Sequence, residues 1–183
     1  MTVKEIIIVA SRYLGVDKEV EGYLTSTNPG GQIITETLLK CFNIVENELA
    51  LDYLPLIVED VVNTTTGQVD FSKLSKSAVK IVSVKDKDGK SVKYDLFTQY
   101  LVAQPGELTV RYTYTPPPKG IFESSEYKLY VSNRMIVYGI AAQYYYLNGM
   151  FDEGEIWNKK YREAIAAAYR ANPAGVVASR RWE

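Results

Sequence analysis

The stretch Met135–Phe151, MIVYGIAAQYYYLNGMF, decides the fold that this sequence predicts. It contains no charged residue, although Gly139, Gln143, Asn148 and Gly149 interrupt its apolar character. A helix that is apolar on nearly every side must be covered on nearly every side. Because the rest of a 183-residue chain offers little to wrap this helix, we expect a second copy of the protein to supply the cover.

Tyrosine is abundant, with 15 in the chain, and it dominates this helix. A tyrosine side chain gives a large contact area, and its hydroxyl tolerates partial exposure, so protein interfaces are enriched in it. Packing in the core is the alternative for any single tyrosine. Stacking on nucleic acid is disfavoured, because no lysine or arginine lies between Arg134 and Lys159 to bind phosphates. The predicted subunit interface comprises Tyr138, Tyr144, Tyr145 and Tyr146.

Apolar residues at helical spacing predict helices on both sides of the middle of the chain. Thr2 and Glu5 form a capping box at the start of a first helix, which ends at Gly15. A short helical piece covers about Lys18–Leu24, and a longer helix covers about Gln32–Leu51. The N-terminal third is therefore predicted to be helical.

The last third predicts a helical hairpin. After the apolar helix, a second helix begins at Asp152, with Glu155 completing another capping box. Its inward stripe comprises Trp157, Tyr161, Ala164, Ile165 and Ala168.

Between Leu54 and Thr115 the apolar period changes to two, which is typical of β-strands. Asp86–Gly89 is a turn of the Asp-Gly hairpin type, after which a strand returns through Val92 and Leu96. Pro105-Gly106 makes a further turn before the most regular strand, where Leu108, Val110, Tyr112 and Tyr114 share one face. Such short links predict an antiparallel meander.

These patterns define an α+β fold, a helical bundle with an inserted antiparallel β-meander. The predicted domain organisation assigns 1–53 to N-terminal helices and 54–119 to the β insertion. The helical hairpin, 120–172, packs with 1–53 as one domain, and 173–183 form an extended C-terminal tail.

The composition limits the catalytic and binding chemistry that the protein could perform. The chain has no histidine, which is the usual general base near neutral pH and the commonest metal ligand. Lys+Arg 21 against Asp+Glu 22 gives a net charge of -1, so there is no bulk basic bias toward nucleic acid. The single cysteine, Cys41, lies in an apolar helical pattern and is expected to be a buried, inert thiol. No segment has the length and apolarity of a membrane span.

Three groups of residues have the composition of possible sites. Glu59 and Asp60 are neighbours in a strand, so their carboxylates point to opposite faces. Asp86 and Asp88 fit a hairpin turn better than a calcium loop, because the downstream bidentate glutamate is missing. Gly30-Gly31 precedes a helix, but no phosphate-binding frame follows it. The sequence therefore predicts no catalytic, cofactor-binding or metal site, and no enzyme.

The end of the chain is a candidate docking segment. Tryptophan and arginine are the residue types favoured as anchors in binding sites. We expect this segment to dock into a groove of a partner, with a frayed or self-packed end as the alternative. The candidate anchors are Arg180, Arg181 and Trp182.

The order of elements resembles the head–tail connector (adaptor) proteins of tailed bacteriophages. Two regions carry the resemblance: VKEIIIVASRYLGV with QIITETLLKCFNIVENEL, and MIVYGIAAQYYYLNGMFDEGEIWNKKYREAI. The resemblance implies a homo-oligomeric ring, usually of twelve copies, in the neck of the virion after synthesis in the host cytoplasm. It also implies contact with the portal protein and with the next neck or tail protein, and a channel for passing DNA without sequence-specific binding. The C-terminal arm would dock on the portal.

Other functions stay open at this point. Another neck or tail-completion protein, such as a stopper or tail terminator, would share the virion context. A tyrosine-rich, non-catalytic binding module on the host side belongs to a different class. A histidine-free enzyme that works through carboxylates or tyrosine is a further alternative.

Overall fold

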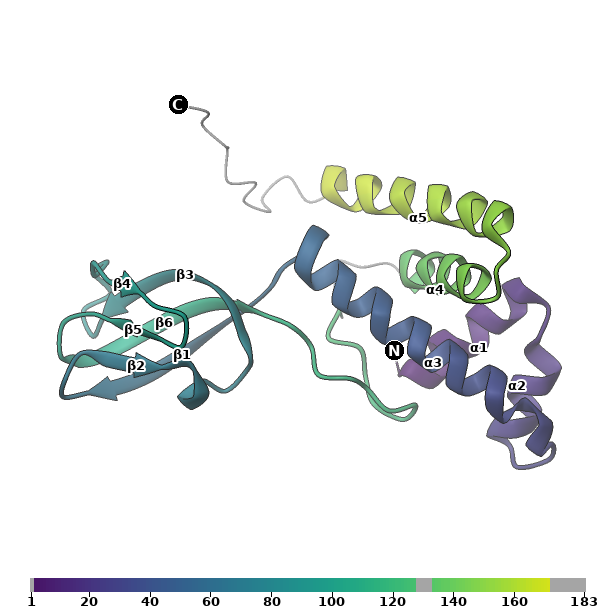
Figure 1. Cartoon of the computed structure of the whole chain (residues 1–183), viewed down its shortest axis with the longest axis horizontal. Helices are drawn as coiled ribbons and strands as arrows, with labels where there is room; N and C mark the ends of the chain where they lie inside the picture. Colours follow the sequence, from purple (N-terminus) through teal and green to yellow (C-terminus); the bar gives the residue numbers. More distant parts are fainter. Residues whose placement is uncertain (1, 128–132, 172–183) are drawn as a thin grey trace. The chain divides into compact units, whose positions relative to one another are not determined.

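The computed structural model describes residues 2–127 and 133–171 (Figure 1). Within these residues the fold is α+β, with five α-helices and two small antiparallel sheets. The chain divides into a helical unit, made by the segments up to Glu46 and from Pro118 onward, and an inserted β unit, Asn47–Pro117. The sequence predicts the insertion at 54–119, so the structure places both of its boundaries earlier in the chain.

The first helix, α1 (Val3–Leu14), begins with the predicted capping box. The Thr2 hydroxyl accepts a hydrogen bond from the Glu5 backbone N–H at 3.3 Å, and the Glu5 carboxylate accepts one from the Thr2 N–H at 2.9 Å. Gly15 ends the helix at φ +71°, a left-handed conformation that costs glycine little. The short helix α2 (Asp17–Leu24) follows.

The long helix α3 (Gln32–Glu48) is shorter than the predicted Gln32–Leu51. Its last predicted turn belongs to a π-helical segment, Leu49–Tyr53, closed by a 2.6 Å hydrogen bond from the Leu54 N–H to the Leu49 carbonyl. Before α3, any side chain at Gly31 would collide with the backbone carbonyl of Glu19 in α2. Gly31 therefore allows a close approach of two backbones, which is a structural role.

The predicted hairpin consists of α4 (Asn133–Leu147) and α5 (Phe151–Ala171). Figure 1 shows α4 between α3 and α5 in the helical unit. A Cβ atom at Gly139 of α4 would lie 2.8 Å from the Val45 side chain of α3 and 3.1 Å from the Tyr161 ring of α5. Glycine at this position therefore lets three helices meet closely.

The burial of α4 corrects the expectation that a second copy has to cover it. The first half of the helix is enclosed by the chain's own α1, α3 and α5. The apolar pattern identified a helix that needs cover, but it could not show that helices distant in sequence converge on it. The apolar residues of α4 that are at most 2% exposed are Met135, Ile136, Val137, Ile140, Ala141 and Ala142.

The β unit contains two three-stranded sheets. Every strand pairing is antiparallel, as predicted. The strand order is not that of a simple meander, because the last strand lies in the middle of the first sheet. In that sheet the order is β1 (Leu56–Thr64), β6 (Gly106–Tyr114), β3 (Ala78–Asp86); in the other it is β2 (Gln68–Asp70), β5 (Tyr100–Val102), β4 (Asp95–Leu96).

The predicted alternation of β6 is confirmed. Leu108, Val110 and Tyr112 are fully buried, and they meet Val69 and Leu101 of the other sheet in one apolar core. The core of the β unit therefore lies between its two sheets.

The Asp-Gly turn is also confirmed, whereas the strand predicted to return from it is shorter. The Asp86 carboxylate accepts hydrogen bonds from the backbone N–H groups of Asp88 and Lys90, both at 2.9 Å, and Gly89 has φ +78°. Beyond the turn the chain forms only an isolated bridge at Ser91 before the two residues of β4.

Candidate functional site

Tyr138 lies in an aromatic cluster built by three helices. Its ring centroid is 6.0 Å from that of Tyr13 in α1 and 5.6 Å from that of Trp157 in α5. Tyr13 and Trp157 are 5.5 Å apart, and the Lys160 ammonium lies 4.2 Å from the Trp157 ring centroid. Tyr138 is half-buried by these contacts, so its predicted role between subunits stays a prediction.

Tyr146 joins the two helices of the hairpin. Its ring lies where a Cβ atom at Gly154 would stand, and its hydroxyl donates a 2.8 Å hydrogen bond to the Glu155 carboxylate. Burial and this hydrogen bond raise the pKa of Tyr146, and the same bond holds the pKa of Glu155 below its ordinary value. The Glu155 carboxylate thus accepts hydrogen bonds from Tyr146 and Asn158 within the hairpin. The predicted capping box was wrong, because Asp152 already lies inside α5.

Tyr144 and Tyr145 are half-buried neighbours, with ring centroids 6.1 Å apart. Burial raises the pKa of Tyr144. The assignment of both tyrosines to a subunit interface stays a prediction.

The tip of the hairpin is more exposed than any of the predicted interface tyrosines. Leu147 is 57% exposed, Met150 44% and Phe151 68%. Sequence reasoning assigned these residues to the covered run and missed their exposure. The sequence contains a signal for this exposure, because Asn148 and Gly149 end α4 before the apolar run ends. Residues beyond that point do not belong to the packed helix.

The best carboxylate pair in the sequence is divided between two faces of β1, as predicted. Glu59 forms a 3.6 Å ion pair with Arg111 on the exposed face. Asp60 accepts hydrogen bonds from the Tyr112 hydroxyl at 2.6 Å and from the Ser75 backbone N–H at 2.6 Å. The Tyr112 hydroxyl in turn accepts one from the Lys76 N–H at 3.1 Å. Asp60 therefore anchors the segment before β3.

The electrostatics of this anchor are those of a structural network. Partial burial by itself would raise the pKa of Asp60, but the hydrogen bonds from Tyr112 and Ser75 outweigh it and lower that pKa. Burial, followed by the hydrogen bond to Asp60, raises the pKa of Tyr112. A charged carboxylate and a protonated phenol are both favoured, and neither group is poised to exchange a proton near neutral pH.

Replacing Tyr112 by phenylalanine should lower the free energy of unfolding by about 1–2 kcal/mol, because the Lys76 N–H and the Asp60 carboxylate each lose a partner. Since the bond from Tyr112 lowers the Asp60 pKa, its contribution is present at neutral pH and is lost as the pH falls through that pKa. The difference between wild type and variant should therefore shrink in acid. Denaturant titrations across the acid range measure it.

Tyr94→Phe is the matched control for this prediction. The Tyr94 side chain packs against the same core, and its hydroxyl makes no hydrogen bond to the described part of the chain. We expect it to change the free energy of unfolding by less than about 0.5 kcal/mol. Equal effects of the two substitutions, or an acid-independent effect at Tyr112, would contradict the role given to Asp60.

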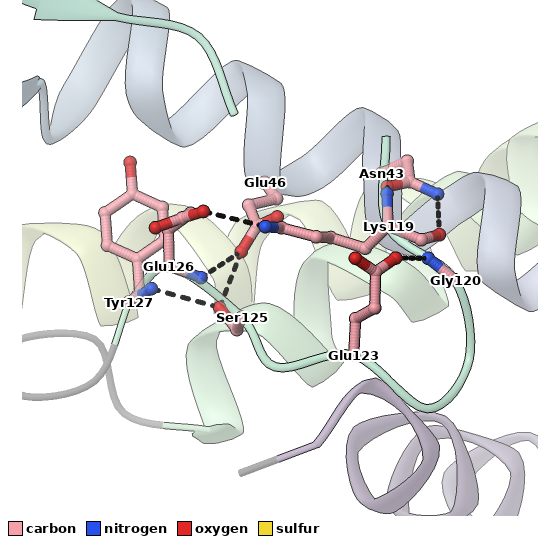
Figure 2. A network of polar contacts seen from close by, with 8 residues as sticks. All are labelled: Asn43, Glu46, Lys119, Gly120, Glu123, Ser125, Glu126 and Tyr127. Atoms are coloured by element: carbon pink, nitrogen blue, oxygen red, sulfur yellow. Dashed lines mark hydrogen bonds and ion pairs between the residues drawn. The ribbon is translucent and has the colours of Figure 1, made fainter. Parts of the chain in front are cut away.

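A second polar network, missed by sequence reasoning, joins α3 to the segment Pro118–Tyr127 (Figure 2). The Asn43 amide donates to the Lys119 carbonyl at 3.1 Å, and the Lys119 N–H donates to the Asn43 side-chain oxygen at 2.6 Å. One oxygen of Glu46 accepts hydrogen bonds from the Ser125 hydroxyl at 2.6 Å and from the Glu126 N–H at 2.8 Å. Lys119 and Glu126 form an ion pair at 2.7 Å.

Glu46 is the buried acid of this network, with only 1% of its surface exposed. Its second carboxylate oxygen has no hydrogen-bond partner among the residues that the structure describes. Burial raises the pKa of Glu46, against the lowering effects of Ser125, the Glu126 N–H and Lys119. The detectable signal was an acid within the apolar spacing of α3, between Phe42 and Leu49.

The same segment also closes the start of α1. The backbone N–H groups of Val3 and Lys4 donate to the carbonyls of Glu123 and Ile121, both at 2.8 Å. These donors have no partner within a helix of their own. The returning chain therefore bonds to α3 on one side and to the first turn of α1 on the other, and it closes the helical unit.

Cys41 is fully buried, as expected, and burial raises its pKa to about 12. Within residues 2–127 and 133–171, no group of three or more cysteine or acidic side chains is placed to hold a metal ion. No helix of the described residues is long and apolar enough to cross a membrane. The candidate docking residues Arg180, Arg181 and Trp182 lie outside the described residues.

The fold and these networks define an α+β protein that consists of a helical unit and an inserted β unit. The chain matches no protein-family model and no curated protein sequence.

Proposed function

We propose that the chain is a structural virion protein, an adaptor that forms a ring on the portal and extends the DNA channel toward the tail. The observation that carries the proposal is the joining of the two regions that resemble head–tail connectors. Residues 3–16 and 32–49 lie on one side of the insertion, and residues 135–165 lie on the other. Their helices α1, α3, α4 and α5 pack as one unit.

The use of the polar side chains supports a structural role. Asp60, Glu46 and Glu155 each accept hydrogen bonds that hold elements of the fold together. The exposed apolar side chains of the hairpin tip, by contrast, make a surface suited to contact with another protein. Assembly with other proteins uses exposed apolar surface of this kind.

In this proposal the ring is homo-oligomeric, usually of twelve copies in proteins of this kind, and it stands between the portal and the next neck or tail protein. Arg180, Arg181 and Trp182 dock on the portal. The DNA passes through the ring without sequence-specific binding.

Mixing the full chain with the purified portal ring of the same virus tests the proposal. We expect the two to co-sediment, and negative-stain images to show an added layer on one end of the portal. Simultaneous alanine substitution of Arg180, Arg181 and Trp182 should lower the affinity at least 100-fold, since tryptophan and arginine anchors dominate such interfaces. Alanine substitution of Lys87 and Lys90, in the turn after β3, is the control.

Failure of the full chain to join the portal at any salt concentration would overturn the adaptor proposal. Addition only to a portal that already carries another ring would indicate a stopper or tail-completion protein. Binding of a saccharide in place of the portal would indicate a tyrosine-rich binding module.

A further inference from the structure

The outer face of α5 carries six exposed residues in a straight stripe. They alternate in steps of four and three, the spacing of the contact positions in a helix pair. The opposite side of the helix, with Tyr161 and Ile165, is buried in the helical unit. A shallow groove runs along the stripe from Asp152 to Ala166, and Glu155 and Arg162 beside the stripe also line it. The stripe comprises Asp152, Ile156, Lys159, Glu163, Ala166 and Arg170.

The charges along this stripe are complementary to those of a second copy of the stripe that runs in the opposite direction. An antiparallel copy centred at position 161 brings Asp152 opposite Arg170, Ile156 opposite Ala166, and Lys159 opposite Glu163. Two-fold symmetry makes each of these pairings occur twice. A parallel copy would instead bring each charge opposite an identical charge, which is unfavourable.

We propose that this stripe on α5 is a self-recognition surface, on which a second copy of the chain binds through its own α5 in antiparallel orientation. The occupant follows from the charge order, because every charged position of the stripe finds the opposite sign only in a reversed copy of itself. Ile156, 60% exposed, becomes covered by Ala166 of the other copy.

The size of the stripe determines how tightly two copies are expected to bind. A helix of 21 residues is about 32 Å long, and its stripe contains one large apolar side chain. Exposed ion pairs contribute little individually and are screened by salt. The pair is therefore a weak dimer, with a Kd on the order of 0.1 mM at low salt, and it dissociates as the salt concentration rises.

This contact does not rest on the adaptor proposal. Copies in a ring meet head to tail through two different surfaces, whereas a two-fold contact uses the same surface twice and stops at two. The α5 pair is thus a state of free copies, distinct from neighbours in a ring.

Complementary charge reversals provide the test, by sedimentation velocity of the full chain over a range of concentrations at low salt. Asp152→Arg brings arginine opposite arginine, and Arg170→Asp brings aspartate opposite aspartate. Each variant alone should raise the Kd at least tenfold. An equimolar mixture of the two variants restores both ion pairs across the interface and should return the Kd to within about threefold of wild type.

Glu153→Arg is the matched control, because it reverses a neighbouring exposed acid in the same first turn of α5 but outside the stripe. It should leave dimerisation within about threefold of wild type. Circular dichroism checks that all variants keep their helices.

Two outcomes would overturn the proposal. The first is a full chain that remains a monomer at millimolar concentration and low salt. The second is a dimer that neither reversal weakens or that the mixture fails to restore.

Discussion

Replacing Gly139 by valine should lower the free energy of unfolding by about 3 kcal/mol, at the upper end of the usual cost of overpacking. The first added carbon alone would lie 2.8 Å and 3.0 Å from the two methyl groups of Val45 and 3.1 Å from the Tyr161 ring. Val45 is fully buried and stiff at χ1, so it cannot turn aside. Denaturant unfolding followed by helical circular dichroism measures the loss.

The Val45→Ala background separates overpacking from the intrinsic cost of valine in a helix. Val45→Ala alone leaves a cavity and should itself destabilise, but it removes the two methyl groups that the new side chain strikes. The double variant should therefore be more stable than the sum of the single effects predicts. Ala167→Val, on the exposed side of α5, isolates helix propensity and should cost less than about 1 kcal/mol. Strict additivity at 139 and 45 would contradict the proposed three-helix contact.

The glycine also shows where the sequence predicted well and where it did not. The α4 helix, its hairpin with α5 and the inward stripe of α5 followed from local spacing, because helical periodicity depends only on neighbouring residues. The helices that pack against α4 could not be predicted from local spacing. Gly139 appeared as an interruption in an apolar run, although it is the point at which Val45 and Tyr161 approach from distant parts of the chain.

The β unit shows the same limit. The alternation in β6 and the Asp-Gly turn follow from local pattern and turn chemistry, and both are present. The position of β6 between β1 and β3 depends on pairing between strands distant in the sequence. Alternation is equally consistent with an edge strand or a central strand, so the order could not be predicted.

Of the candidate sites, the sequence predicted the positions of two carboxylates, whereas other contacts depend on tertiary structure. Opposite faces for Glu59 and Asp60 follow from strand geometry alone. The hydrogen bond from Tyr146 to Glu155 requires the hairpin to close, and the exposure of Phe151 requires the helix to end where Asn148 and Gly149 end it. Both depend on tertiary structure.

Removing the buried acid of α3 is the second change with a large expected effect. Glu46→Ala should lower the free energy of unfolding by about 2–4 kcal/mol, because the Ser125 hydroxyl and the Glu126 N–H both lose their acceptor in a buried site. Glu36→Ala, at an exposed position of the same helix, is the control and should cost less than about 0.5 kcal/mol. Equilibrium unfolding in denaturant compares the two.

Glu46→Gln tests the charge of this acid separately from its hydrogen bonds, since an amide oxygen can still accept from Ser125 and Glu126. Burial holds the native-state pKa of Glu46 above its unfolded-state value, so the native protein binds more protons between the two values. Stability due to Glu46 is therefore fully present below the unfolded pKa, about 4.3, and is lost as the pH rises through the native pKa.

The glutamine variant does not titrate, so its stability relative to wild type should increase as the pH rises from about 4 toward neutrality. The groups that face Glu46 are Lys119, which opposes the raised pKa, and Glu126, which adds to it. Lys119→Met should therefore raise the Glu46 pKa further and make the fall in stability with rising pH larger. If the difference between wild type and Glu46→Gln stays constant with pH, Glu46 is charged throughout, and Lys119 compensates its charge in full.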